Sequence, residues 1–124
     1  MQHHDDHINE SEYRLMDILW DEAPINSMKL VGLAGERLGW KKSTTYTILR
    51  GLREKGLVKN ERALVETLVT RNDVQRQESR AFLDKKFHGS LPAFVAAFLG
   101  DERLTREEAD KLQALIDKAK EEEA

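Results

Sequence analysis

Residues 43–58 read STTYTILRGLREKGLV, and this stretch decides the fold. Four of its residues recur at the i, i+3, i+4, i+7 spacing of one helix face: Thr45, Ile48, Leu49 and Leu52. Ser43 or Thr44 is expected to cap the start of this helix, and Gly56 suits its end. The stretch therefore predicts a helix that packs on one side and presents small polar groups and one arginine on the other.

Two further helical patterns come before this stretch. Within 12–20, EYRLMDILW, the apolar residues form one broad stripe, and Asn9 or Ser11 can cap that helix. The residue before Pro24 avoids the helical region of backbone space, so the helix is expected to end there. A second helix is predicted to begin at Asn26 or Ser27, both of which are good caps, and to run to Leu38, with Gly39 just after its end.

A β-hairpin is predicted directly after the quoted stretch. Strands are expected to begin at 57–58 and to cover 63–69, and the polar residues KNER at 59–62 are expected to form the turn. The order helix, helix, helix, hairpin is that of a winged helix-turn-helix. The expected fold is mostly α with a small β-hairpin, with a recognition helix at 43–56, a wing at 57–70 and a C-terminal helical arm.

The rest of the chain predicts helices that extend beyond the winged helix-turn-helix, which we call the head. A long helix is expected from Asn72 or Asp73, with a break where Gly89 and Pro92 interrupt it. A last helix is expected after the capping box TREE at 105–108. The chain is therefore divided into a flexible tail, a winged-helix DNA-binding domain and a helical dimerisation domain: 1–8, 9–72 and 73–124.

The C-terminal helices carry more apolar surface than a head of this size can cover. A symmetric second copy would cover it, which predicts a homodimer in which both protomers use the same surface. The alternative is that these helices fold back onto their own head. The expected interface residues are aliphatic and aromatic: Phe82, Leu83, Phe87, Leu91, Phe94, Val95, Phe98, Leu99, Leu112, Leu115 and Ile116.

Charge is unevenly distributed along the chain. The whole chain has a net charge of -3, but residues 40–62 hold seven Lys or Arg and two Asp or Glu, a local net of +5. Because fields are screened within about 8–10 Å at physiological salt, a local basic island decides whether phosphates can be contacted. The alternative interpretation is an ordinary solvated helix face.

The exposed face of the predicted recognition helix suits the major groove of duplex DNA. Small hydroxyl side chains let the backbone approach the bases and donate to phosphates, while arginine can bind guanine or the DNA backbone. Lysines just before the helix and a basic wing tip would add phosphate contacts. The predicted DNA-binding residues are Lys41, Lys42, Ser43, Thr44, Tyr46, Thr47, Arg50, Lys59 and Arg62.

Several classes of protein are excluded or disfavoured. The chain has no cysteine, which excludes disulfides and thiolate metal sites, and neither a metal nor a cofactor is expected. No apolar run reaches ~18 residues and residues 1–10 lack the blocks of a signal peptide, so a cytoplasmic protein without membrane insertion is expected. Convergent catalytic groups are not evident, so an enzyme is not expected. A winged-helix module that binds protein and a small-molecule-responsive regulator remain as alternatives.

Three segments together resemble a known family. The patterns at 12–20, at 43–58 and at 78–90, ESRAFLDKKFHGS, resemble the penicillinase repressor family of BlaI/MecI/CopY-type regulators, and the resemblance covers roughly 9–119. It implies a homodimeric transcriptional repressor whose head binds a palindromic operator and whose C-terminal helices dimerise. It also implies, for one branch, induction by a membrane sensor-protease pathway, with the cleaved bond equivalent to Ala97-Phe98.

The chain departs from that family at four points, one of which is a short wing with Leu64 and Glu66 where aromatic residues are frequent. Ala97 stands where the proteolysed branch has asparagine, which weakens the case for control by cleavage. The cysteines of the copper-responsive branch are missing, so thiolate metal sensing is excluded. Gly51 replaces a usual basic residue, and glycine inside a helix costs roughly 1 kcal/mol relative to alanine, so it is expected to weaken the helix or alter a DNA contact.

Overall fold

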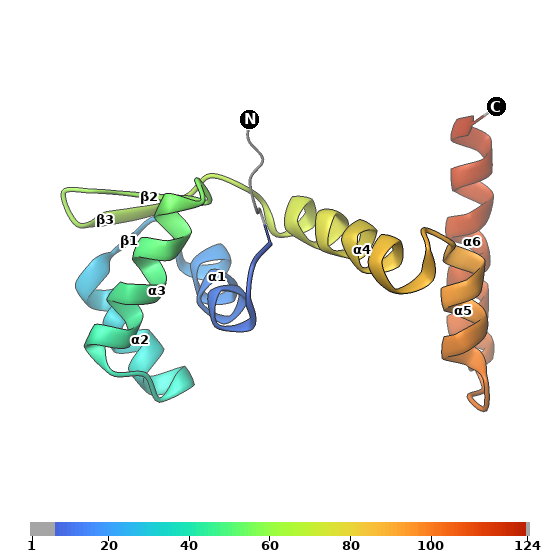
Figure 1. The fold of residues 1–124 in the computed structure, drawn as a ribbon, viewed down its shortest axis with the longest axis horizontal. Helices are drawn as coiled ribbons and strands as arrows, with labels where there is room; N and C mark the ends of the chain where they lie inside the picture. Colours follow the sequence, from blue (N-terminus) through green and yellow to red (C-terminus); the bar gives the residue numbers. More distant parts are fainter. Residues whose placement is uncertain (1–6, 124) are drawn as a thin grey trace. The chain divides into compact units, whose positions relative to one another are not determined.

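The computed structural model describes residues 7–123, which fall into two compact units divided between Ser79 and Arg80 (Figure 1). The first unit holds three helices, a three-stranded sheet and the start of a fourth helix; the second unit holds the remaining helices. The prediction of a mostly α fold with a small β-hairpin is confirmed. In chain order the elements are α1 Glu10–Glu22, β1 Ile25–Asn26, α2 Ser27–Leu38, α3 Lys42–Glu54, β2 Val58–Glu61, β3 Leu64–Thr67, α4 Arg71–Phe87, α5 Leu91–Leu99 and α6 Arg106–Glu123.

The chain enters α1 through a capping box. The side chain of Asn9 accepts from the backbone N–H of Glu12, and the carboxylate of Glu12 accepts from the backbone N–H of Asn9. Of the two predicted caps, Asn9 is therefore the one used. Residues 1–6 of the predicted tail lie outside the described residues, whereas Ile8 is buried, so packed structure begins before residue 9.

Helix α2 begins and ends as its sequence indicates. The side chain of Asn26 accepts from the backbone N–H of Met28, and Gly39 follows the helix with φ of 71°, a left-handed conformation that glycine adopts without strain. Helix α2 and the buried stripe of α1 together form one side of the core of the head.

The prediction for the start of α3 is wrong. Neither Ser43 nor Thr44 caps this helix; the N-cap is Lys41, which makes no side-chain capping hydrogen bond, and the helix is already formed at Lys42. The helical residues are 42–54 instead of 43–56, but Gly56 follows the C-cap Lys55 with φ of 78°, so the prediction that this glycine ends the helix is confirmed. The hydroxyl residues therefore lie within the first turns, where their side chains are exposed.

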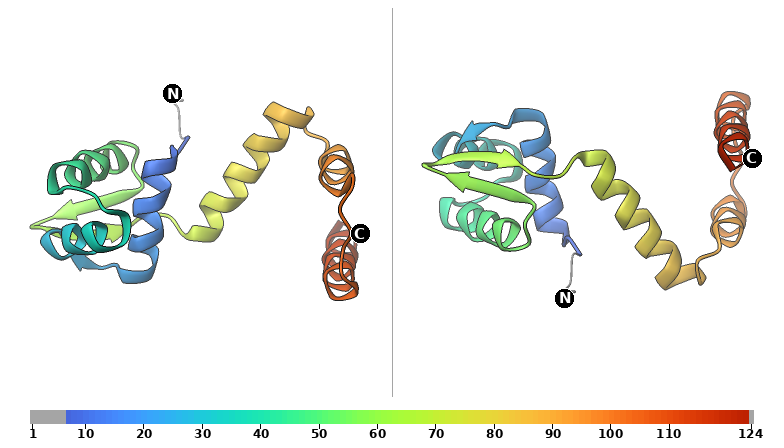
Figure 2. Two further views of the ribbon diagram at one scale, coloured as in Figure 1. Left: turned by 90° about the horizontal axis from the view of Figure 1, so that it is seen from below. Right: turned by 90° about the horizontal axis from the view of Figure 1, so that it is seen from above.

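The predicted turn of the hairpin is also wrong. Residues 59–61 belong to β2, and the turn is the pair Arg62-Ala63, both with positive φ. In a two-residue hairpin loop this conformation matches the right-handed twist of the strands. β3 is shorter than predicted, and it lies between β2 and β1, an antiparallel strand at Ile25–Asn26 that was not expected (Figure 2).

The head's core lies between the helices and the sheet. α1 contributes the largest share of it, and α3 and β3 pack against α1. Thr45 of α3 is fully buried, and its hydroxyl donates to the backbone oxygen of Lys41 at 3.3 Å. The predicted inner face of α3 is thus confirmed. The core cluster comprises Leu15, Met16, Ile18, Leu19, Ile25, Leu30, Ala34, Leu49, Leu52, Val58 and Val65.

Helix α4 starts earlier than predicted and ends where predicted. It begins at Arg71, and the hydroxyl of Thr70 accepts from the backbone N–H of Asp73, so neither Asn72 nor Asp73 is the cap. The chain turns after Phe87. The predicted break before α5 is confirmed.

Within the second unit, aromatic rings connect the end of α4 with α5. Phe94 lies 5.7 Å from Phe82 and 5.4 Å from Phe87 between ring centroids, both in edge-to-face geometry, and 6.2 Å from Phe98. The capping box at the start of α6 is confirmed, since Thr105 and Glu108 exchange hydrogen bonds with each other's backbone N–H groups. Among the described helices, none is long and apolar enough to cross a membrane.

Candidate nucleic-acid interface

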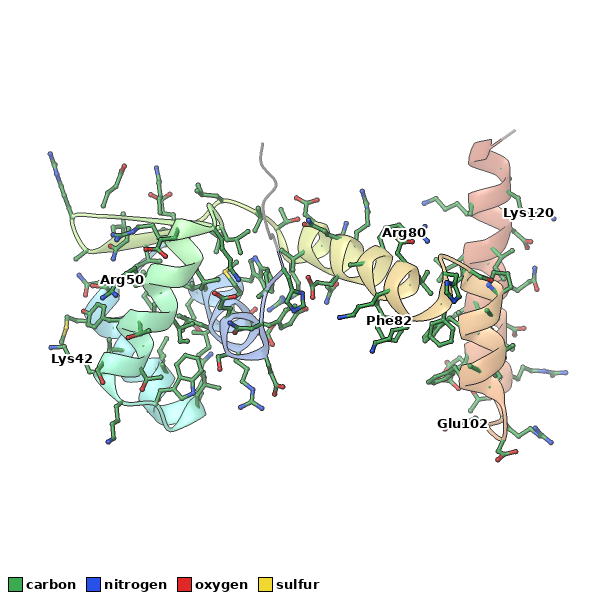
Figure 3. The ribbon with its side chains drawn as sticks, viewed as in Figure 1. Lys42, Arg50, Arg80, Phe82, Glu102 and Lys120 are labelled. Atoms are coloured by element: carbon green, nitrogen blue, oxygen red, sulfur yellow. The ribbon has the colours of Figure 1, made fainter. Side chains whose placement is uncertain are left out.

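The outer face of α3 is polar, cationic and solvent-exposed. Figure 3 shows Lys42 near the start of this helix and Arg50 further along it. The remaining exposed side chains between them are small hydroxyls, while the opposite face is buried in the core. The exposed residues of this face that were predicted to bind DNA are Lys41, Lys42, Ser43, Thr44, Thr47 and Arg50.

The start of α3 leaves backbone donors free. Because Lys41 provides no capping side chain, the N–H groups of the first turn have no side-chain acceptor. A helix N-terminus with unsatisfied N–H groups and the positive end of the helix dipole is favourable for a phosphate. A side-chain cap at Ser43 or Thr44 would have occupied these donors. Because α3 lacks such a cap, the donors are available to a phosphate.

Tyr46 is placed differently from its neighbours. It is half-buried, and its hydroxyl lies 3.4 Å from Oγ of Ser27 and 3.4 Å from Sδ of Met28, both at the start of α2. Its ring also packs against the core cluster. Tyr46 therefore connects α3 with α2, and only part of its ring faces outward.

A hollow of about 220 Å³ lies between α3 and the hairpin. Tyr46, Leu49, Arg50, Arg53 and Asn60 line it. The side-chain oxygen of Asn60 is buried without a hydrogen-bond partner among the described residues.

Two residues of this hollow were missed from sequence. Arg53 stands three positions after Arg50, so the i, i+3 spacing could have revealed that both arginines share a face. Asn60 was assigned to a turn, and its position on a strand facing α3 follows only from the pairing of β2 with β3.

The wing residues differ in how free they are. Lys59 lies 4.0 Å from a carboxylate oxygen of Glu61 and 3.7 Å from one of Glu66, so its charge is partly compensated. Arg62 is exposed in the two-residue turn of the hairpin. Of the two predicted wing contacts, Arg62 is the more available to a phosphate.

The cations of the first unit are unequally paired. Away from α3, many of them pair with surface carboxylates, as Arg14 does with Glu10 and Arg37 with Glu22. Among residues 7–79, the basic residues that form no ion pair are Lys29, Lys41, Lys42, Arg50, Arg53, Arg62 and Arg76. All but Lys29 and Arg76 lie on α3, at its start or at the wing turn. Positive charge that is not compensated within the protein is therefore concentrated on one region.

The second unit exposes many apolar side chains. None of its described residues is fully buried, and several predicted interface residues stand open to solvent, with Phe98 58% and Leu115 65% exposed. Partly covered members are Leu83, Phe87, Phe94 and Leu99; the others that are exposed are Phe82, Leu91, Val95, Leu112 and Ile116. Ala97 and Phe98, the predicted cleavage position, are exposed on α5, inside a helix.

The sequence is similar to those of known proteins over most of its length. The model of the penicillinase repressor family matches residues 8–118. The penicillinase repressor of Bacillus licheniformis is 26% identical over 117 residues, which cover 91% of this chain and 91% of that protein. The methicillin resistance regulatory protein MecI of Mammaliicoccus sciuri is 23% identical over 115 residues, or 90% of this chain and 94% of that protein.

These matches extend over both units of the chain. The resemblance inferred from 12–20, 43–58 and 78–90 is therefore confirmed. A family of repressors also agrees with the prediction that the chain is not an enzyme. Since the family match covers most of its length, the chain belongs to the penicillinase repressor family.

Proposed function

We propose that this protein is a homodimeric transcriptional repressor that binds a palindromic operator in duplex DNA. The observation that carries the proposal is the concentration of unpaired cations on α3, at its start and at the wing turn, around a face of small exposed hydroxyls. The relatives support the same role, since they are named penicillinase repressor and methicillin resistance regulatory protein.

In this proposal α3 enters the major groove, which is ~12 Å wide and admits one helix. Thr44, Thr47 and Arg50 would face base edges, and the free N–H groups at the helix start, with Lys41 and Lys42, would bind a backbone phosphate. Arg62 would reach the neighbouring strand from the wing. The phosphate contacts would supply affinity and position, while the side chains in the groove would select the sequence.

The apolar surface of the second unit is the basis for proposing a second copy as its partner. α5 is apolar along its length, yet none of its residues is buried within one chain, and α6 exposes Leu115 and Ile116 on the same helix face. Such an area is unfavourable in water and is typical of an obligate interface. A twofold dimer also doubles the salt-dependent contacts of one head and matches a palindrome.

The DNA proposal is tested with a duplex pool from which the wild-type protein selects its preferred sequence. Lys42→Ala and Arg50→Ala should each weaken binding of the selected palindrome by at least about tenfold, because the homodimer loses the contact in both protomers and a base contact is worth about 1–3 kcal/mol. Arg76→Ala is the matched control, because Arg76 is equally exposed and unpaired within the described residues but lies on α4. If both α3 variants bind as tightly as wild type across a salt series, α3 is not the recognition helix.

The dimer proposal is tested by sedimentation of the full chain. Phe98→Asp and Leu115→Asp place charges on the apolar surface and should produce a monomer that still binds a single half-site weakly. Lys42→Ala should remain a dimer, which separates assembly from DNA contact. A wild-type chain that sediments as a monomer at micromolar concentration would contradict the proposed dimer.

A further inference from the structure

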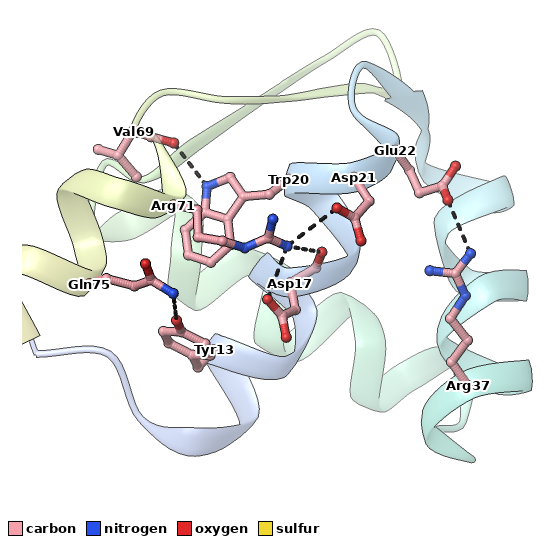
Figure 4. A network of polar contacts seen from close by, with 9 residues as sticks. All are labelled: Tyr13, Asp17, Trp20, Asp21, Glu22, Arg37, Val69, Arg71 and Gln75. Carbon is pink, nitrogen blue, oxygen red and sulfur yellow. Dashed lines mark hydrogen bonds and ion pairs between the residues drawn. The ribbon is translucent and has the colours of Figure 1, made fainter. Parts of the chain in front are cut away.

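Arg71, the first residue of α4, connects this helix to α1 (Figure 4). Its Nη2 donates to Oδ1 of Asp17 at 3.1 Å, to the backbone oxygen of Asp17 at 3.2 Å and to Oδ1 of Asp21 at 3.3 Å. The guanidinium also lies over the ring of Trp20, 5.2 Å from its centroid. The guanidinium of Arg71 thus binds two carboxylates and stacks on one aromatic ring. All three of these groups lie on one face of α1, at the i, i+3, i+4 spacing.

Further contacts join α1 to residues on either side of Arg71, one before α4 and one within it. Nε1 of Trp20 donates to the backbone oxygen of Val69 at 3.0 Å, and Nε2 of Gln75 lies 3.5 Å from the hydroxyl of Tyr13. The rings of Tyr13 and Trp20 meet edge to face at 5.6 Å. We call this set the α1–α4 bracket; its members are Tyr13, Asp17, Trp20, Asp21, Val69, Arg71 and Gln75.

Several interactions hold Arg71 in the bracket. Partial burial lowers the pKa of Arg71, but its hydrogen bonds to Asp17 and Asp21 and their negative charges outweigh that effect, so the pKa is raised above its ordinary value. Single surface ion pairs contribute little, because solvent and side-chain entropy oppose them. Here the pair is reinforced by ring stacking and by Val74, which is buried one turn further along α4. The first turns of α4 are therefore held on the head as one body.

We propose that Arg71, through this bracket, fixes the direction in which α4 leaves the head and thereby determines the operator spacing that the dimer accepts. This rests on the proposed function. α4 is one continuous helix from Arg71 to Phe87, and it carries the chain from the first unit into the unit with the apolar surface. A firm joint transmits the geometry of the dimer to the heads, whereas a loose joint would let each head find its half-site independently.

DNA geometry makes such a joint consequential. Adding one base pair between half-sites shifts one of them by about 3.4 Å and rotates it by about 35° around the helix axis. Two heads that are rigidly joined cannot follow both changes, so one of them loses its contacts. Two heads on flexible joints can follow them with a smaller loss of affinity.

The experiment uses the full-length dimer and the palindrome that wild type selects from a random duplex pool, remade with the centre lengthened or shortened by one to three base pairs. Wild type should lose affinity by about tenfold or more when the spacing changes. Arg71→Ala and the double variant Asp17→Asn/Asp21→Asn should reduce this dependence to about threefold. A duplex with one half-site should bind all three proteins alike.

The two variants change the net charge in opposite directions. A general charge effect on DNA affinity would separate them, whereas loss of the bracket makes them behave alike. Arg37→Ala is the matched control, because it breaks an ion pair of 3.0 Å between α2 and Glu22 of α1 in which no residue of α4 takes part, and it should keep the wild-type spacing preference. Asp17 and Asp21 are more than half exposed, so the double variant remains informative if Arg71→Ala fails to fold.

The outcomes separate this inference from the proposed function. Folded variants that retain the wild-type spacing preference overturn the role of Arg71, and so does a wild-type dimer that binds all spacings equally. A wild-type protein that selects no duplex overturns the proposed function, and this inference with it.

Discussion

A Cβ atom at Gly51 would lie 3.0 Å from Oε2 of Glu12, the buried carboxylate of α1 that faces this point of α3. The other carboxylate oxygen of Glu12 is held by Nζ of Lys55 at 2.7 Å and by the backbone N–H of Asn9 at 3.0 Å. Gly51 therefore accommodates a buried charge from the neighbouring helix. The expectation that this glycine alters a DNA contact finds no support in its position, which faces α1.

The close approach of Gly51 to Glu12 predicts that Gly51→Ala destabilises the wild-type chain but stabilises a variant that lacks the Glu12 carboxylate. In the wild-type chain it should lower the free energy of unfolding by about 1 kcal/mol, because the buried carboxylate of Glu12 must shift against its hydrogen bonds from Lys55 and Asn9 to admit the methyl group. In a Glu12→Ala background it should raise that free energy by about 1 kcal/mol, since only the gain in helix propensity remains. Urea unfolding followed by the fluorescence of Trp20 and Trp40, both in the head, measures the cycle. Equal effects in both backgrounds would contradict the steric explanation.

Removal of Lys55 should destabilise the head. Its side chain is 25% exposed, that of Glu12 only 6%, and Nζ also donates to the backbone oxygen of His7 at 2.6 Å. Lys55→Ala leaves a buried carboxylate without its cation and should cost about 2–3 kcal/mol in the free energy of unfolding. Lys59→Ala, which removes a more exposed lysine from weaker pairs, should cost less than about 0.5 kcal/mol. If the two variants unfold at the same urea concentration, the buried pair contributes no more to stability than the exposed pairs of Lys59.

Glycine in place of Ala63 should stabilise the wing turn. Ala63 has φ of 65°, a left-handed conformation that costs roughly 1–2 kcal/mol for a residue with a Cβ atom. Ala63→Gly should therefore stabilise the head by about 1 kcal/mol, while Ala63→Val, with a branched Cβ, should destabilise it. Thermal unfolding of the two variants provides the measurement. A loss of stability in the glycine variant would show that the turn is not strained.

Arg53 should contribute to DNA binding although the sequence pattern did not single it out. It shares the hollow with Arg50 and forms no ion pair among the described residues. Arg53→Ala should reduce the slope of log affinity against log salt concentration by about 2, because the dimer loses one phosphate contact in each protomer and each contact contributes about 1. Titrations of the selected palindrome at several salt concentrations measure the slope. Arg76→Ala should leave it unchanged, and an unchanged slope in both would place Arg53 outside the interface.

The helix order, the inner face of α3 and the break after Phe87 were predictable because each depends on local rules. Periodicity identifies which side of a helix is buried, and glycine or proline marks where the backbone must change direction. The caps of α3 and α4 were predicted wrongly for a related reason. Several neighbouring residues could serve equally as caps, and the choice between Thr70 and Asn72, for example, is decided by the packing of α4 on α1.

The sequence by itself determined that this chain is a winged helix-turn-helix followed by apolar helices, with a basic island at 40–62, because apolar spacing and charge can be read along the chain. Only the tertiary structure decided that Gly51 accommodates a carboxylate and that Arg71 joins α4 to α1. Those contacts link residues 39 to 54 positions apart, Gly51 with Glu12 and Arg71 with Asp17, and no local pattern specifies which distant side chains meet. Their partners are selected by the packing of the helices on a shared core, which is a property of the whole fold.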